Sequence, residues 1–127
     1  MLYICSMKRI KKQKISRKNF YPQYLKLINV ILPEPLTQKE IDILSAFMEL
    51  DGDIANNDRF GTQARKLVRE RFMFKSNSNL DNYIKYFKRK GVLYIDDSGI
   101  LQVVDSINIP KGEKEVELTF NFTFNEE

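Results

Sequence analysis

Hydrophobic residues recur at helical spacing in four stretches of the chain, and each stretch predicts a helix. The first lies within residues 20–32 and is ended by the prolines that follow it. The second begins directly afterwards, because Thr37 with Glu40 three residues later forms a capping box, and it is expected to end at Gly52. The apolar face of the first predicted helix consists of Tyr24, Leu27, Ile28 and Ile31.

A polar loop within residues 51–61 separates the second predicted helix from the third, for which Thr62 is the expected N-cap. The loop is rich in Asp and Asn, but their spacing does not place ligands where an EF-hand needs them, so we expect no metal there. Residues 76–79 are a cluster of cap-forming residues that begins the fourth helix, and Gly91 ends it. The core face of this helix carries Leu80, Tyr83, Ile84 and Phe87.

After Gly91 the hydrophobic pattern changes from helical to alternating. The stretches VLYI and ILQVV flank the turn DDSG, which predicts a β-hairpin with Gly99 in the left-handed region. Near the C-terminus, apolar and polar residues alternate over about nine positions, which predicts a strand with one apolar face. That face carries Val116, Leu118, Phe120, Phe122 and Phe124.

These patterns predict an α+β fold in three parts. Residues 1–19 form a basic N-terminal arm, residues 20–110 form the domain, and residues 111–127 form a C-terminal β-strand arm. A strand needs a partner, and we favour pairing with the domain's own hairpin as a third strand. The alternative is pairing with a neighbouring subunit. The candidate partner-binding residues are Phe120, Phe122 and Phe124.

Charged residues are segregated along the chain. Residues 1–27 contain eight basic and no acidic residues, and residues 59–90 contain ten basic and two acidic residues. The other two blocks are acidic, with one basic against seven acidic residues at 28–58 and two against eight at 91–127. A protein with one surface that faces a polyanion shows this pattern, although solvated faces of alternating sign also produce it.

The composition excludes most catalytic chemistry. The chain has no His, no Trp and the single Cys5, which removes the usual zinc ligands, the Ser-His and Cys-His nucleophile pairs and any internal disulfide. We therefore expect no enzymatic activity, no metal and no cofactor. No apolar run reaches the roughly 18 to 20 residues of a membrane span, and the apolar start precedes the basic cluster, the reverse of a secretory signal. An intracellular (cytoplasmic) or virion location without membrane contact is expected.

Three short motifs mark the helices and the hairpin. TQKE at 37–40 begins one helix, SNSNL at 76–80 begins another, and KRKGVL at 88–93 leads into the hairpin. In this order, residues 36–104 resemble a winged helix-turn-helix domain. The resemblance implies a winged-helix-like three-helix core with a β-hairpin wing, to which this chain adds an extra N-terminal helix and a C-terminal β-strand.

In that family the helix before the wing enters the major groove of DNA, so the resemblance implies that residues 76–90 are a recognition helix. Asn can pair with adenine, and Lys and Arg can reach phosphate or guanine. The wing departs from the family's pattern, because Asp96 and Asp97 at its tip would be repelled by phosphates. The candidate DNA-contacting residues of the helix are Asn77, Asn79, Asn82, Lys85, Lys88 and Arg89.

The basic arm is a second candidate contact, because such arms bind phosphate without reading sequence. A solubilising tail explains the same composition equally well. Aromatic rings on the fourth helix could stack on bases, but helical spacing favours core positions for Tyr83 and Phe87. The candidate residues of the arm are Lys8, Arg9, Lys11, Lys12, Lys14, Arg17 and Lys18.

We therefore expect a non-enzymatic nucleic-acid-binding protein with duplex DNA as its partner, acting as a small regulator of a phage or mobile element. The alternative is a structural or interaction subunit of a large assembly, such as a phage virion or neck component. In that case the arms contact neighbouring protein subunits or build a homo-oligomer. Winged helices also serve as protein-interaction modules, so both functions stay open.

Overall fold

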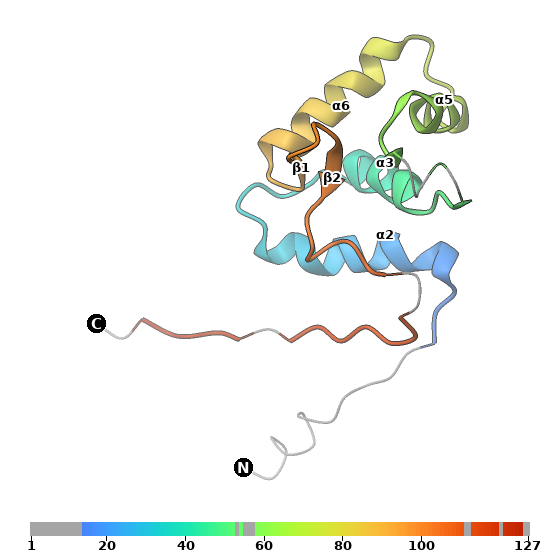
Figure 1. Ribbon diagram of the computed structural model, residues 1–127. Helices are drawn as coiled ribbons and strands as arrows, with labels where there is room; N and C mark the ends of the chain where they lie inside the picture. Colours follow the sequence, from blue (N-terminus) through green and yellow to red (C-terminus); the bar gives the residue numbers. More distant parts are fainter. Residues whose placement is uncertain (1–13, 53, 55–57, 111–112, 120, 126–127) are drawn as a thin grey trace.

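The computed structural model describes residues 14–52, 54, 58–110, 113–119 and 121–125. Within these residues the chain is α+β, with four α-helices followed by a two-stranded sheet, an order compatible with the expected winged-helix-like layout (Figure 1). None of the helices described here is long and apolar enough to cross a membrane. The elements are α2 (Arg17–Ile28), η1 (Asn29–Ile31), α3 (Gln38–Met48), α5 (Thr62–Arg71), α6 (Asn77–Arg89), β1 (Leu93–Ile95) and β2 (Leu101–Val103).

Helix α2 begins at Arg17, inside the predicted arm, and packs on α3 with a different stripe from the one predicted. Leu27 and Ile31, expected inside, are 52% and 63% exposed. Leu27 lies about 100° around the helix from Ile28, which is buried. Ile31 belongs to the 3-10 turn η1, whose tighter winding rotates it off the stripe. The buried residues of α2 are Tyr21, Tyr24, Leu25 and Ile28.

Side-chain hydrogen bonds fix the connection from α2 to α3. The Nδ2 of Asn29 donates to the carbonyl oxygen of Leu36 at 3.0 Å, and the N–H of Leu36 donates to Oδ1 of Asn29 at 2.6 Å. The next residue begins α3 with the predicted capping box, which is confirmed. Glu40 N–H donates to Thr37 Oγ1 at 3.2 Å, and Thr37 N–H donates to Glu40 Oε1 at 2.8 Å.

Helix α3 ends at Met48, earlier than the predicted end at Gly52. Arg59 caps the carbonyl groups at this end of the helix. Its guanidinium Nη1 donates to three carbonyl oxygens at 3.0 to 3.1 Å. Carbonyl groups at a helix end have no partner within the helix, so this half-buried cation replaces the missing donors. Burial lowers the pKa of Arg59. The accepting carbonyls belong to Phe47, Met48 and Leu50.

The predicted loop at 51–61 is partly helical, since Ile54 and Asp58 have helical backbone, whereas Gly52 has φ +68°. Residues 53 and 55–57, which complete the calcium-like run, lie outside the described residues. The N-cap of α5 is Gly61 rather than Thr62, which is the first helical residue. Glycine fits this cap because a Cβ there would lie 2.7 Å from Oδ2 of Asp58.

Helices α5 and α6 end in the same kind of left-handed turn. After α6, Gly91 has φ +80° and the N–H of Val92 donates to the carbonyl oxygen of Phe87 at 3.0 Å. The predicted stop at Gly91 is therefore confirmed. After α5, Met73 takes the equivalent position with φ +57°, and the N–H of Phe74 donates back into the helix at 3.0 Å. A non-glycine residue in this conformation is strained.

The predicted hairpin is confirmed. Strands β1 and β2 are antiparallel, with Leu93 opposite Val103 and Ile95 opposite Leu101. Gly99 in the connecting turn has φ +81°, as its place in DDSG predicts.

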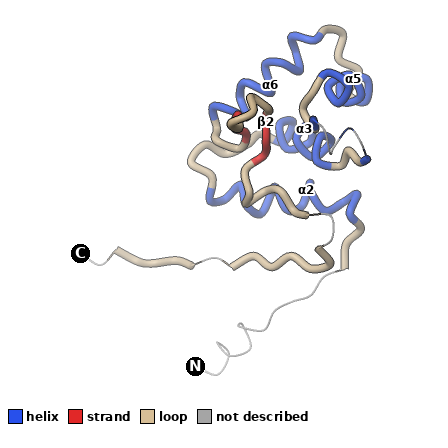
Figure 2. Tube along the Cα trace, in the orientation of Figure 1, coloured by secondary structure: helices blue, strands red, loops and turns tan. Residues whose placement is uncertain are grey.

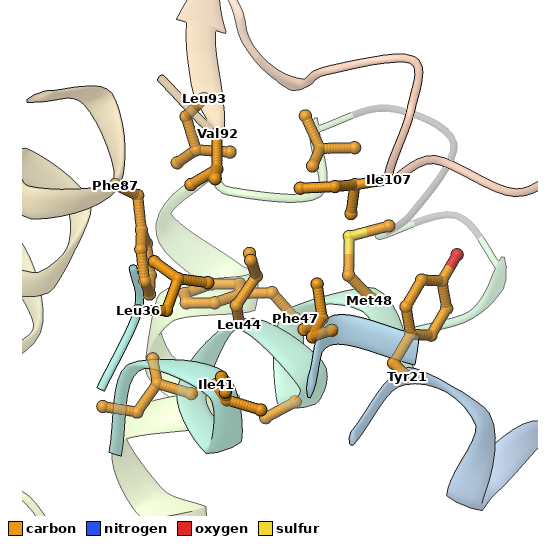
Figure 3. Close-up of a cluster of buried hydrophobic side chains, with 14 of the residues drawn as sticks. Tyr21, Leu36, Ile41, Leu44, Phe47, Met48, Phe87, Val92, Leu93 and Ile107 are labelled. Atoms are coloured by element: carbon orange, nitrogen blue, oxygen red, sulfur yellow. The ribbon is translucent and has the colours of Figure 1, made fainter. Parts of the chain in front are cut away.

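The core lies around α3, most of whose residues are buried between α2, α5, α6 and the hairpin (Figure 3). Phe47 of α3 is fully buried, and its ring centroid lies 4.9 Å from that of Phe60. From the other side, Phe87 and Val92 bring the end of α6 and the start of the hairpin into the same cluster. Ile107, also fully buried, brings in the segment after β2.

Two tyrosines of α2 hold the chain that leaves the hairpin. The hydroxyl of Tyr24 donates to the carbonyl oxygen of Ser106 at 2.6 Å, and the hydroxyl of Tyr21 accepts from the N–H of Ile109 at 3.3 Å. Burial raises the pKa of Tyr24, so the donating form is kept. Helix α2 is thus joined by hydrogen bonds to the segment that follows β2.

The favoured pairing of the C-terminal segment with the hairpin is wrong for the residues described. Residues 113–119 and 121–125 belong to no strand, and the sheet formed by the described residues has two strands, not three (Figure 2). Pairing with a neighbouring subunit stays a prediction. Alternation makes a segment suited to a sheet, but a strand forms only where a second backbone supplies hydrogen bonds. Phe120 lies outside the described residues.

Candidate nucleic-acid interface

The outward face of α6 is polar and basic along its whole length. Leu80, Ile84 and Phe87 hold the opposite face of the helix in the core, so the orientation of the outer face is set by packing. In Figure 1 the helix lies along one edge of the molecule. All six side chains proposed from the sequence are exposed: Asn77, Asn79, Asn82, Lys85, Lys88 and Arg89.

Lys85 and Lys88 carry positive charge that no described acidic residue neutralises, since no ion pair among the described residues involves either. Arg89 is different. Its Nε lies 3.8 Å from Oε2 of Glu34, and its guanidinium lies 5.2 Å from the ring centroid of Tyr86. Both side chains of the Arg89 and Glu34 pair are more than half exposed, so this weak pair leaves Arg89 able to turn to a phosphate.

The arginines of α5 are largely engaged with other side chains. All three contact acceptors from neighbouring elements. Two of these contacts reach the first turns of α6, so the charge on α5 positions α6. The pairs are Arg65 with Asp81 at 3.1 Å, Arg69 with Asn77, and Arg71 with Glu49 at 2.9 Å.

A buried ion pair holds the other end of α6. The Nζ of Lys90 lies 2.6 Å from Oε1 of Glu40 and also donates to the carbonyl oxygen of Pro35 at 3.1 Å. Burial alone would raise the pKa of the Glu40 carboxyl, but the hydrogen bonds from Lys90 and Thr37 outweigh it and lower the pKa. Lys90 is therefore a positioning residue for α6, and this role was missed from the sequence.

The tip of the hairpin between β1 and β2 is negative, and its two aspartates have different roles. Oδ1 of Asp96 accepts from the N–H groups of Ser98 and Ile100 at 2.9 and 3.0 Å, and Oδ2 accepts from the side chain of Gln102. These bonds, led by that from Ile100, lower the pKa of Asp96. Asp96 therefore builds the turn, whereas Asp97 is exposed.

The structure places little of the basic arm. Lys14 is exposed, and Arg17 and Lys18 are the first residues of α2, but the side chains of those two are not described. The remaining candidates lie outside the described residues: Lys8, Arg9, Lys11 and Lys12. The two predicted parts of the interface, the arm and α6, are therefore not brought together by the described residues.

A row of aromatic rings connects the end of α5 to α6. Phe74 stacks between Phe72 and Tyr83 with centroids 6.0 Å apart on either side, and Tyr83 meets Tyr86 edge-on at 6.1 Å. Tyr83 packs against the core and Phe87 is fully buried, as helical spacing predicts. Tyr86, 41% exposed, is the most exposed aromatic side chain of α6.

Two of the three candidate partner-binding phenylalanines can be placed. Phe122 is 74% exposed and Phe124 is 87% exposed. They lie in the C-terminal segment, which runs below α2 in Figure 1 and whose Leu118 is partly buried against the core. Neither contributes to the core cluster.

Comparison with protein-family models, curated proteins and solved structures finds no match to this chain. A function therefore has to follow from the side chains themselves. Among the described residues, the exposed face of α6 and the C-terminal segment are candidate surfaces.

Proposed function

We propose that the chain is a winged-helix-like, non-enzymatic DNA-binding protein whose recognition element is α6. The observation that carries the proposal is the exposed face of α6, where Lys85 and Lys88 have no ion pair among the described residues. Phosphate binding requires cations that are not paired with acidic side chains. Within the described part of the chain, Lys85 and Lys88 meet this requirement on a helix whose opposite face is fixed in the core.

The geometry suits an approach to the major groove. An α-helix with side chains is about 10 to 12 Å wide, which the major groove of B-DNA accommodates. Asn79 and Asn82 are exposed in the first half of α6, and Asn side chains can pair with adenine. Lys85 and Lys88 follow in the second half, where they can contact the phosphate backbone.

The wing takes a secondary place in this proposal. Asp97 is exposed, and Asp96 accepts a hydrogen bond within the turn. Both carboxylates lie at the hairpin tip, where phosphates would repel them. DNA is therefore approached with the wing tip turned away from the backbone. The basic arm supplies a further, sequence-independent attraction.

Substitution of the two unneutralised lysines tests the proposal. The double variant Lys85→Ala and Lys88→Ala is expected to weaken binding to a labelled duplex by about 2 kcal/mol, roughly 30-fold. A matched control, Lys26→Ala with Lys114→Ala, removes the same charge from exposed positions away from α6 and is expected to change the Kd by less than about threefold. Equal weakening in both double variants would place the binding surface elsewhere.

The exposure of Phe122 and Phe124 favours a second candidate function, that of an interaction subunit in a larger assembly. Exposed aromatic side chains in an extended segment are suited to a protein partner. Light scattering on the purified chain, with and without duplex DNA, separates the two functions. A defined complex with DNA supports the first, and self-assembly without any DNA binding supports the second.

A further inference from the structure

The end of α2 carries an exposed apolar surface that the core does not use. Leu27 is 52% exposed, Val30 is 75% exposed and Ile31 is 63% exposed. These three residues, called here the α2 patch, lie within five consecutive positions at the junction of α2 and η1. Apolar side chains gathered in this way mark a surface that gains stability when it is covered.

The same chain carries a C-terminal segment in which apolar and polar residues alternate, residues 113–119 and 121–125, called here the tail. Its Leu118 is partly buried against the core cluster. Within it Val116 is 40%, Phe122 is 74% and Phe124 is 87% exposed. The tail follows the segment that Tyr21 and Tyr24 hold on α2. It therefore leaves the domain beside the helix that carries the α2 patch (Figure 1).

The two surfaces are complementary in charge. Residues 17–31, which form α2 and η1, contain three basic and no acidic residues. The tail contains three acidic residues and one basic residue. An acidic tail with apolar side chains on alternate positions is thus suited to a basic helix with an apolar patch.

The hairpin is a poorer partner for the tail. Strands β1 and β2 have three residues each, so either edge offers few backbone groups to a segment of about nine alternating residues. The α2 patch needs no backbone pairing, because side-chain contact alone covers it. Within one chain, however, both the α2 patch and Phe124 remain exposed.

From these observations we infer that two copies of the chain exchange their tails, each tail covering the α2 patch of the other copy. The exchange gives two identical contacts related by a two-fold axis, which closes the assembly as a dimer. Each contact joins Val30 and Ile31 of one copy to the Phe124 region of the other. The dimer does not depend on DNA, so its test is separate from that of the proposed function.

Light scattering after size-exclusion chromatography tests the exchange on the full chain. The parent is expected to be a dimer that dissociates on dilution, and Val30→Asp and Phe124→Asp are each expected to raise the dimer dissociation constant at least tenfold. Met73→Asp is the matched control, because it places the same charge at an 85% exposed apolar side chain outside both surfaces. It should leave the dissociation constant unchanged. Thermal melts of all three variants establish that they fold.

Mixing the two weakened variants identifies which surfaces meet. In a mixed dimer the intact tail of the Val30→Asp copy can cover the intact α2 patch of the Phe124→Asp copy. The mixture is therefore expected to dimerise more tightly than either variant alone. A parent that is monomeric at all concentrations overturns the exchange, and so does a mixture no tighter than its components. A dimer unaffected by either substitution also overturns it.

Lys85→Ala with Lys88→Ala serves as the reference for the DNA-binding surface. This double variant is expected to dimerise like the parent. Weaker DNA binding with an intact dimer in this variant is what both proposals predict. In the parent, DNA binding without a dimer overturns the exchange alone, and a dimer without DNA binding overturns the proposed function alone.

Discussion

The Nζ of Lys90 lies 2.6 Å from Oε1 of Glu40, and the two side chains are only 10% and 4% exposed. This contact joins the C-terminal end of α6 to the first turn of α3 across 50 positions of sequence. It connects the helix proposed to bind DNA to the most buried helix of the fold. Loss of one partner would leave the other charge buried and unpaired.

Lys90→Met is therefore expected to lower the free energy of unfolding by about 3 kcal/mol, measured by urea denaturation. Arg89→Met is the matched control, because it removes the neighbouring cation from a pair that is more than half exposed. The control should cost less than about 1 kcal/mol. Similar losses in both variants would show that the buried pair of Lys90 and Glu40 stabilises the fold no more than an exposed pair does.

Stability should also fall in acid because of Glu40. Its folded-state pKa is lowered from the ordinary 4.5, so the unfolded chain takes up the proton more readily than the folded chain. The stabilisation from Glu40 is thus present above about pH 4.5 and is lost as the pH falls through the lower folded-state value. Urea denaturation from about pH 6 to pH 3 should show a smaller acid-induced loss in Glu40→Gln than in the parent. Identical pH profiles would contradict the lowered pKa.

Met73 offers a stabilising substitution. It has φ +57° at the end of α5 and is 85% exposed, so Met73→Gly relieves backbone strain and loses little packing. We expect a gain of about 1 kcal/mol, seen as a higher Tm. Gly91→Met, at the equivalent position after α6, is the reverse experiment and should lower the Tm. A Tm that falls in Met73→Gly would show that the side chain has a stabilising contact.

The two aspartates of the wing tip should respond differently to substitution. Asp96→Asn is expected to lower the Tm, because the carboxylate of Asp96 accepts hydrogen bonds from Ser98, Ile100 and Gln102. Asp97→Asn is expected to leave the Tm unchanged and to leave duplex binding unchanged or tighter, since it removes a negative charge near DNA. Weaker DNA binding in Asp97→Asn would mean that the wing tip contacts the nucleic acid directly.

Local signals in the sequence predicted much of this fold. The capping box of Thr37 and Glu40, the stop at Gly91 and the hairpin turn at Gly99 are each confirmed, because each depends on residues within a few positions of one another. The outward face of α6 was also predicted, because a strongly periodic helix separates its apolar and polar side chains.

Interactions between distant positions were not predictable in this way. Lys90 meets Glu40 across 50 positions and Tyr24 meets Ser106 across 82, and no periodicity within a window reports such contacts. The sequence pattern places Arg59 in a polar loop, whereas in the structure its side chain caps α3. The alternating C-terminal segment showed suitability for a strand but could not show whether a second backbone was present.

The dependence of duplex binding on salt tests the proposed role of α6 most directly. If about five phosphates are neutralised, the slope of log K against log salt is expected to lie near −4 to −5 for the parent. Lys85→Ala with Lys88→Ala should bring that slope closer to zero by about 2, one for each lost phosphate contact, while Lys26→Ala with Lys114→Ala should leave it unchanged. A parent that does not bind at about 50 mM salt, or whose slope is the same in the Lys85 and Lys88 double variant, would contradict DNA recognition by this helix.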